Sequence, residues 1–229
     1  WGFARVLRLE HPALCTQSTD VSRGVRLVAS ATTLTPTTET EGAWAGNVHR
    51  VARLRACTTA NGVATALARG AYAITGGLGG LGLRAAALLV ETGATCVVLS
   101  SRSGRIGGPV DAAKRNAKMR VAACNVSETA DAFALLALAA PTGVLHAAAV
   151  LHDAMLRSMA ASHVDAVCAP KALAASHVQA IVTPAPLEAM GLFSSVASTF
   201  GNVGQANYAT ANAYLDVLAR CHRCHGTVG

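Results

Sequence analysis

Aromatic side chains are scarce in this sequence: Phe, Trp and Tyr together make up 4% of its 229 residues. Proteins that hold single-stranded nucleic acid stack its bases on aromatic side chains, so this scarcity argues against that function. Long apolar runs are missing as well. The stretch "FALLALAA" stops at Pro141, short of the roughly 20 apolar residues that a membrane-spanning helix needs. We recognise no signal peptide and expect a cytoplasmic protein, with an organelle such as a plastid as the alternative.

Acidic residues are also few. The sequence has 12 Asp and Glu against 19 Lys and Arg, which gives a formal charge of +7 and a pI of about 9.4. Such an excess can indicate an anionic partner: nucleic acid, a phosphate-bearing cofactor or an acidic protein. The basic residues are dispersed, however, and we interpret their densest run, "KRNAKMR" over 114–120, as a solvated helix end. We therefore favour an ordinary basic enzyme over a nucleic-acid-binding protein.

The seven cysteines do not suggest a disulfide framework. Their number is odd and several stand inside apolar runs, which is typical of reduced thiols in an intracellular protein. The run "CHRCH" over 221–225 matches the C-x-x-C-H pattern of c-type haem attachment. Nothing else in the sequence supports haem, and no further paired ligands suggest zinc. We interpret the run as a chance match and expect no metal site.

The composition and the hydrophobic pattern of the sequence change near residue 70. Residues 1–70 differ from the rest and are expected to form a small β-rich subdomain. Within them, residues 16–46 are rich in Thr and Ser and lack helical periodicity, which predicts short strands and loops. From Ala71 to residue 229, strand-like and helix-like segments alternate. Strands are expected over 71–75, 95–100, 120–124, 143–150 and 190–195, and helices over 80–92, 127–140, 158–179 and 206–224. This alternation predicts an α/β fold with a Rossmann-like, doubly wound parallel sheet.

Two of the expected helices carry end signals. Gly93 follows the helix expected over 80–92, and glycine is the usual residue in the left-handed conformation that ends a helix. Ser127 opens the helix expected over 127–140 and is a plausible N-cap.

A glycine-rich turn follows the first strand of the second part. "TGGLGGLG", over 75–82, contains G-x-G-x-x-G as Gly77, Gly79 and Gly82 and opens the next helix. Glycines in this pattern permit a tight turn, a close backbone approach to a pyrophosphate and close helix–strand packing. Because the helix N-terminus offers free N–H groups and a partial positive charge, we expect a dinucleotide here.

The residues after the second strand indicate which dinucleotide. "SSRSG" places Ser101 and Arg102 there, with no Asp or Glu nearby. An acidic residue at this point holds the ribose hydroxyls of NAD, whereas an arginine accommodates the 2′-phosphate of NADP. The sequence therefore favours NADPH over NADH.

Several motifs, in this order, resemble the short-chain dehydrogenase/reductase superfamily, and more narrowly the ketoreductase domain of type I polyketide synthases and animal-type fatty acid synthases. They are "WGFARVLRLEHP", "HRVARLR", "YAITGGLGGLG", "VVLSSRSG", "GVLHAAAVLHDAML", "CAPKALAASH" and "FSSVASTFGNVGQANYATANAYLD". The resemblance covers nearly the whole chain. It implies that residues 1–70 are the C-terminal part of such a domain's structural subdomain and linker, and that 71–229 are the catalytic subdomain.

The resemblance also explains why no lysine stands four residues after Tyr208. These ketoreductases carry Y-x-x-x-N, here Tyr208 and Asn212, and place the lysine upstream, here Lys171. It implies that Tyr208 donates a proton to the substrate ketone, helped by the ammonium of Lys171. Ser195 would hydrogen-bond the substrate carbonyl, and Asn212 would orient Lys171 or a water that relays protons.

Further residues are implied as cofactor contacts. The set is Thr75, Gly77, Leu78, Gly79, Gly82, Ser101, Arg102, Asn125, Val126, Ala147, Ala148, Lys171 and Tyr208. Two positions depart from the family pattern: Asn125 replaces an aspartate, and Ala149 replaces a glycine and brings a methyl group near the cofactor.

The implied activity is NADPH-dependent reduction of a β-ketoacyl thioester, carried on an acyl carrier protein of a multidomain synthase. Alternatives are the ketoreductase of a fatty acid synthase, a free-standing reductase, and a catalytically silent scaffold. In relatives, an L-x-D motif after the fourth strand accompanies a D-configured hydroxyl, and the opposite class has a tryptophan eight residues before the tyrosine. Residues 151–153 read "LHD", which interrupts the full "LDD", and Phe200 stands at the tryptophan position, so the resemblance implies a D-configured hydroxyl. The sequence opens on Trp1 and ends at "CHGTVG", before the strand and lid that relatives continue with, so we expect a domain truncated at both ends.

Overall fold

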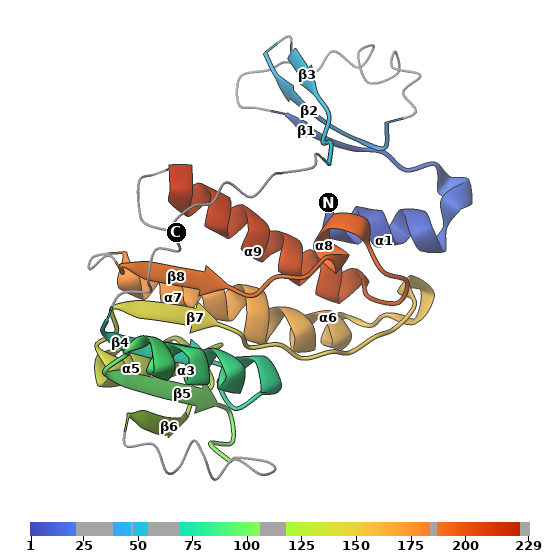
Figure 1. Cartoon of the computed structure of the whole chain (residues 1–229). Coiled ribbons are helices and arrows are strands. Elements are labelled where there is room, and N and C mark those ends of the chain that lie inside the picture. The colour runs from blue at the N-terminus through green and yellow to red at the C-terminus, as the bar shows by residue number, and fades with distance from the viewer. Residues whose placement is uncertain (22–38, 47, 55–68, 106–117, 184–186, 225–229) are drawn as a thin grey trace.

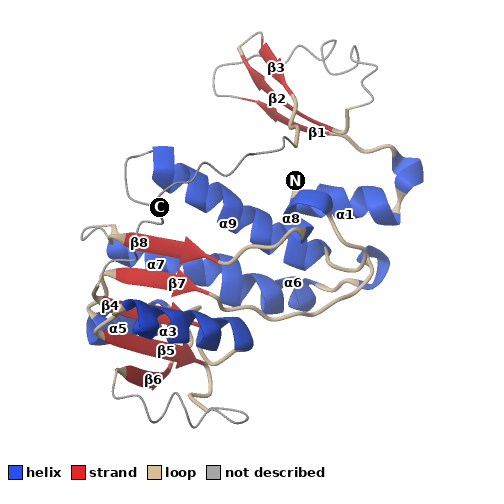
Figure 2. Ribbon diagram, in the orientation of Figure 1, coloured by secondary structure: helices blue, strands red, loops and turns tan. Residues whose placement is uncertain are grey.

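The computed structural model describes residues 1–21, 39–46, 48–54, 69–105, 118–183 and 187–224. Within them the strands form two sheets (Figures 1 and 2). The larger sheet has the order β6-β5-β4-β7-β8, and all its neighbouring strands are parallel. Its strands are β4 (Ala71–Thr75), β5 (Cys96–Ser101), β6 (Met119–Ala123), β7 (Gly143–His146) and β8 (Ala189–Leu192). This confirms the predicted Rossmann-like fold.

The strand order reverses direction beside β4. From β4 the chain moves outward through β5 to β6, then returns to place β7 and β8 on the other side of β4. In open parallel sheets, ligands bind in the crevice outside the carboxyl ends of the strands at such a reversal. The turns that follow β4, β5 and β7 are therefore the expected location of a site.

Helices cover both faces of this sheet because successive strand residues point to opposite sides. On one face, Ile74 and Leu99 pack against α3 (Gly80–Thr92). The opposite face of the same strands packs against α5 (Thr129–Ala139) and α7 (Ala174–Val182). The residues of that second cluster include Ala73, Val98, Val144, Leu135, Leu136, Ala174 and Val178.

The longest helix, α9 (Ala206–Cys224), packs against α6 (Ala161–Cys168) and, through Leu215, against Ala175. Its bounds and those of α3 coincide with the helices expected over 206–224 and 80–92. Gly93 ends α3 in the left-handed conformation, with φ of 110°, as its position in the sequence predicted.

Other element ends differ from expectation. Ser127 does not cap α5, because Glu128 occupies the N-cap position and makes no side-chain cap bond. The strand expected over 143–150 ends at His146, where the chain leaves the sheet. The helix expected over 158–179 consists of α6, a π-helical turn at Ala169–Leu173 (η3) and α7. Since Pro170 has no N–H, it cannot make the regular helical hydrogen bond, which accounts for the turn.

Residues 2–10, for which no element was expected, form the helix α1 (Gly2–Glu10). Helix α1 packs on α9 and α8 (Ala197–Phe200), and Val6 is fully buried against Ala206 and Ala209. Short 3₁₀ turns lie at Pro12–Leu14 (η1) and Leu156–Ser158 (η2). The division of the chain at residue 70 stays a prediction, and α1 packs across it.

The smaller sheet is mixed. Strand β1 (Ser18–Val21) pairs in parallel with β2 (Glu41–Ala45), and β2 pairs antiparallel with β3 (Val48–Arg50). The strand expected in "HRVARLRACTT" thus ends at Arg50, and its last residues, 55–59, lie outside the described part of the chain. Of "KRNAKMR", residues 114–117 also lie outside it. Met119 and Arg120 begin β6, so the helix end expected there was wrong for these residues.

Within the described ranges, no helix combines the length and apolar character that crossing a bilayer requires. The same part of the chain contains no group of three or more His, Cys, Asp or Glu side chains placed to hold a metal ion. His225, the last residue of "CHRCH", lies outside it.

Candidate functional site

The glycine-rich turn lies between β4 and α3, and close contacts require glycine at two of its positions, Gly76 and Gly82. Gly76 has a φ of 65°, a conformation that favours glycine, and a Cβ there would lie 2.6 Å from the Cα of Ala148. A Cβ on Gly82 would lie 2.6 Å from the Cα of Gly77. Only glycine at position 82 therefore lets α3 approach the turn this closely. Gly79 stands at the N-cap of α3 with its N–H bonded to the carbonyl of Gly76.

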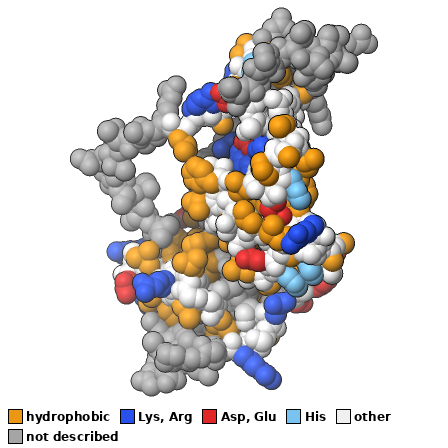
Figure 3. Space-filling view, turned by 90° about the vertical axis from the view of Figure 1, so that its right-hand side faces the viewer, with side chains coloured by type: hydrophobic (Ala, Val, Ile, Leu, Met, Phe, Trp, Pro, Cys, Tyr) orange, Lys and Arg blue, Asp and Glu red, His pale blue; other side chains and the backbone are white. Residues whose placement is uncertain are grey.

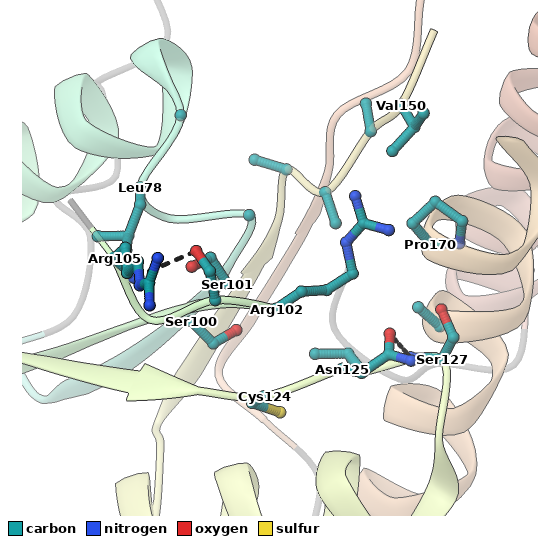
Figure 4. A pocket seen from close by; sticks show the side chains of 18 residues that line it. Leu78, Ser100, Ser101, Arg102, Arg105, Cys124, Asn125, Ser127, Val150 and Pro170 are labelled. Carbon is teal, nitrogen blue, oxygen red and sulfur yellow. Dashed lines mark hydrogen bonds between the residues drawn. The ribbon is translucent and has the colours of Figure 1, made fainter. Parts of the chain in front are cut away.

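A cavity of about 320 Å³ opens in front of this turn, at the reversal of strand order. Eight of the cofactor residues predicted from the sequence line this cavity: Leu78, Gly79, Ser101, Arg102, Asn125, Val126, Ala147 and Ala148. Figure 4 shows the Arg102 side chain extending across the cavity toward Pro170, with Asn125 and Ser127 on the wall formed after β6. The predicted residues thus come together from the ends of β4, β5, β6 and β7.

The other predicted cofactor residues do not line this cavity. Thr75 is fully buried, and its hydroxyl lies 2.6 Å from Nδ1 of His146. Gly77 is packed against β5, where a Cβ would meet the Cα of Leu99 at 3.0 Å. Gly82 supports the turn from α3, as described above. These three residues support the turn on the side that faces away from the cavity.

The cavity suits a phosphate-bearing nucleotide by two observations. Ser100 lines it, and the hydroxyl of Ser100 is buried without a hydrogen-bond partner among the described residues, so a ligand could supply that partner. Arg102 is exposed at the cavity and forms no ion pair with a described acidic residue. A guanidinium in this position can bind a phosphate with two parallel hydrogen bonds.

Sequence reasoning missed further lining residues. They are Gly76, Ser100, Ser103, Arg105, Cys124, Ser127, Val150, Pro170 and Ala174; Ala149, which was expected near the cofactor, also lines the cavity. Most lie within two residues of a predicted one, at the end of a strand, and adjacency in the sequence could have indicated them. Pro170, from η3, is adjacent to the predicted Lys171, whereas Ala174, from α7, is brought to this place only by the fold.

Lys171 follows Pro170 and lies between the cavity wall and α9. Its side chain is buried, with the residue 2% exposed, and Nζ donates a hydrogen bond of 2.7 Å to the carbonyl of Phe193. The same Nζ lies 5.6 Å from the centre of the Tyr208 ring. Burial lowers the pKa of Lys171 from 10.5 to about 8, and the negative charge of Asp216 partly opposes this shift. Lys171 therefore remains mostly protonated at neutral pH.

His146 fixes the backbone that carries Lys171. It is fully buried at the end of β7; Nε2 donates a 2.8 Å hydrogen bond to the carbonyl of Lys171, and Nδ1 accepts one from Thr75. Burial lowers the pKa of His146 to about 4, so the ring is neutral and supplies one donor and one acceptor. β4, β7 and η3 are joined by this one side chain, which the sequence did not single out.

Tyr208 and Asn212 lie one turn apart on α9, and among the described residues Ser195 makes no hydrogen bond to either of them. Asn212 is buried one turn after Tyr208 and donates a 2.8 Å hydrogen bond to the Tyr208 carbonyl, while its Oδ1 has no partner among the described residues. Ser195 follows β8, and its Oγ accepts a 3.2 Å bond from the N–H of Ala197, which leaves its own proton to donate. A contact between Asn212 and Lys171 is not part of the hydrogen-bond network, and that role stays a prediction.

Charged side chains near the site are interspersed. Figure 3 views the molecule toward the carboxyl ends of the larger sheet and shows basic, acidic and hydrophobic side chains mixed over its described part. This agrees with the dispersed basic residues of the sequence.

Comparison with known proteins identifies the family. Residues 70–229 match the family model of the KR domain. Two solved structures superpose over 99% of the chain: an A-type ketoreductase from a modular polyketide synthase (34% identity, TM-score 0.87) and the first ketoreductase of the tylosin polyketide synthase (33% identity, TM-score 0.84). The polyketide synthase GfsA of Streptomyces halstedii is 34% identical over 99% of the chain.

The chain spans about half of those solved chains, 52% and 51%, and 3% of GfsA. The 5-methyl-1-naphthoate synthase of Streptomyces sahachiroi, 32% identical, is covered over 14% of its length. The match extends over the glycine-rich turn, the cavity, Lys171 and Tyr208. The chain therefore belongs to the KR domain family, that is, the ketoreductase domains found in polyketide synthases.

Proposed function

We propose that this chain carries the catalytic machinery for NADPH-dependent reduction of a β-ketoacyl thioester on an acyl carrier protein, which yields the β-hydroxyacyl thioester. The observation that carries the proposal is the position of Lys171. It is buried next to Pro170, which lines the nucleotide-sized cavity, and its ammonium lies over the ring of Tyr208. Lys171, on η3, therefore puts a cation between the cavity and a phenolic proton donor, Tyr208 on α9.

The residues at the cavity fit NADPH. The turn from Gly76 to Gly82 would hold the pyrophosphate against the N-terminus of α3, and Arg102 would bind the 2′-phosphate. Ser100 and Asn125 would supply hydrogen bonds on the adenosine side. When bound there, NADPH supplies the hydride that reduces the carbonyl carbon.

The chain's own part in the reaction is to orient the ketone and deliver a proton. Tyr208 would donate its phenolic proton to the carbonyl oxygen as negative charge develops on it. The ammonium of Lys171 favours this transfer by stabilising the charge left on the phenolic oxygen. Ser195 would donate a second hydrogen bond to the same oxygen and hold the ketone in place. Asn212, with its unpaired buried Oδ1, would orient a water that restores the proton.

The solved relatives support the polyketide setting, because both are ketoreductases of polyketide synthases. We therefore propose that neighbouring synthase domains and a phosphopantetheine-bearing acyl carrier protein are its partners.

The proposal is tested by incubating the protein with a β-ketobutyryl thioester, on a carrier protein and on N-acetylcysteamine, with NADPH or NADH. We expect a β-hydroxy product two mass units heavier and a matching loss of NADPH absorbance. No reduction of either thioester under conditions where a known ketoreductase reacts would contradict the proposal.

A further inference from the structure

Glu10, at the end of α1, joins two loops that are far from it in the sequence. Its Oε2 accepts a hydrogen bond of 2.7 Å from the backbone N–H of Leu156, and its Oε1 accepts one of 2.9 Å from the N–H of Gly204. Both bonds are charge-assisted, since the acceptor is a carboxylate, and such bonds are stronger than those between neutral groups. One side chain thus holds three segments together.

The first of these loops, which leads to Leu156, follows directly on residues of the cavity wall. Residues 147–150 line the cavity after β7, and the chain then runs on to Leu156, where η2 begins. Fixing the N–H of Leu156 therefore fixes the far end of the segment whose near end faces the cofactor cavity.

The second loop leads directly into the helix of Tyr208. Gly204 is buried with a φ of 79°, and α9 begins two residues later. The two loops are also bonded to each other: Ala154 donates its N–H to the carbonyl of Gly204 at 2.8 Å, and the Gln205 amide donates to Asp153 at 2.9 Å. Glu10 closes this arrangement from outside both loops.

Close packing of α1 holds the carboxylate of Glu10 in place. A Cβ on Gly2 would lie 2.3 Å from the carbonyl oxygen of Ala209, so the helix touches the backbone of α9. Val6 is fully buried, and Leu9 lies against Gly201, where a Cβ would be 2.9 Å away. Figure 1 shows α1 beside α8 and the start of α9. The position of Glu10 is therefore coupled to the helix that carries the proton donor.

We propose that Glu10 is a positioning residue for the reaction: it keeps the loop over 151–156 and the loop over 201–205 in the register that orients the ketone toward Tyr208. This inference rests on the proposed function, because the ketone is the substrate that the loops would orient. The parts of the cavity that would bind the phosphates, from Gly76 to Gly82 and at Arg102, belong to other segments, and residues 147–150 precede the loop that Glu10 bonds. Loss of Glu10 should therefore impair use of the ketone and leave NADPH binding unchanged.

The test compares Glu10→Ala and Glu10→Gln with the matched control Glu91→Ala, an exposed glutamate on α3. Hydrogen–deuterium exchange is followed in peptides that contain Leu156, Gly204 or, as an internal reference, Gly77. Steady-state kinetics on a β-ketoacyl thioester and NADPH titrations are measured on the same preparations. Glu10→Gln keeps one carbonyl acceptor and the shape of the side chain, so it reports even where Glu10→Ala folds poorly.

We expect exchange at both loops to be fastest in Glu10→Ala, intermediate in Glu10→Gln and unchanged in Glu91→Ala, with no change at Gly77. We expect kcat/KM for the thioester to fall about tenfold or more in Glu10→Ala, because small errors in the position of reacting groups are costly, while the Kd for NADPH stays within twofold. Unchanged exchange at both loops, or faster exchange with unaltered thioester kinetics, would overturn the proposal. If the variants show this exchange pattern but the wild-type protein reduces no thioester, the result would instead contradict the proposed function.

Discussion

Lys171 gains its chemical character from burial. A lysine in water has little tendency to lose its proton near neutral pH, but this one is enclosed by the cavity wall, Phe193 and α9, which lowers its pKa to about 8. Asp216, itself bonded to Ser198, keeps the pKa from falling further. The residue therefore stays cationic at the working pH and can lose that charge a little above it.

This pKa predicts how activity depends on pH. Because the protonated form of Lys171 assists Tyr208, kcat/KM for the ketone should be constant below pH 8 and fall as Lys171 loses its proton above about pH 8. A pH profile from 6 to 10 measures this. Lys171→Arg keeps its charge over the whole range, so any residual activity should lack the fall near pH 8. A wild-type profile that is flat to pH 10 would be inconsistent with this role.

The position of Arg102 predicts a preference for NADPH over NADH. Arg102→Ala should lower kcat/KM with NADPH by about ten- to a hundredfold, since one charge-assisted contact is worth about 1.5–3 kcal/mol, and should leave kcat/KM with NADH unchanged. Arg84→Ala, an exposed arginine on α3 outside the cavity lining, is the matched control. Equal use of both cofactors by the wild type would show that Arg102 does not select the phosphate.

At the scale of elements, the turn between β4 and α3 offers a paired test. Gly82→Ala places a Cβ 2.6 Å from the Cα of Gly77 and should destabilise the fold by about 1–3 kcal/mol and weaken NADPH binding. Gly80→Ala places its Cβ in open space at the first residue of α3, where alanine is the better helix former. Urea unfolding of both variants measures the difference. Equal stabilities would mean that the close approach of helix and turn is not required.

The bridge formed by His146 predicts a loss of stability in acid. Burial is the main reason that its pKa is about 4 instead of 6.5; its bond to the Lys171 carbonyl opposes this shift, and the Lys171 charge adds to it. Between pH 6.5 and 4 the unfolded chain therefore binds a proton that the folded chain does not. The free energy of unfolding should fall by about 3 kcal/mol as the pH falls through this window.

Denaturant unfolding at several pH values checks this, with His146→Gln as the comparison. The variant should be less stable at pH 7 but should lose less stability than the wild type between pH 6.5 and 4. Parallel pH dependence in the two proteins would show that His146 is not the group responsible.

Local sequence signals predicted some elements well and others poorly. The bounds of α3 and α9 could be predicted because apolar periodicity and Gly93 act within the element itself. The π-helical turn at Ala169–Leu173 was not predicted, although Pro170 inside the expected helix was a sequence signal against a regular helix there. Ser127 does not cap α5 because the helix begins one residue later than expected, which places Glu128 at the N-cap position. The cavity depends on contacts between distant segments: Ala174 of α7 was not predicted, because only the fold brings it to the cavity.

At the scale of the whole molecule, α1 joins the two sheets. Arg5 and Arg8 of this helix form ion pairs with Glu41 of β2, while Val6 packs on α9. Burial would raise the pKa of Glu41, but the hydrogen bonds and charges of the two arginines outweigh burial and hold it below the usual value. The sequence indicated a separate first part because its composition changes near residue 70. It could not show that residues 2–10 pack on the second part, since those contacts join residues about 200 positions apart.

The central claim is that Tyr208 delivers the proton during reduction of a ketone. Tyr208→Phe removes only a hydroxyl, and Tyr214→Phe removes the same group from the same helix, where it bonds Ser176. Measured side by side on a β-ketoacyl thioester with NADPH, Tyr208→Phe should lower kcat by about a hundredfold or more with NADPH affinity within a few-fold of the wild type. Tyr214→Phe should react nearly as fast as the wild type. Near-normal turnover by Tyr208→Phe would contradict the account.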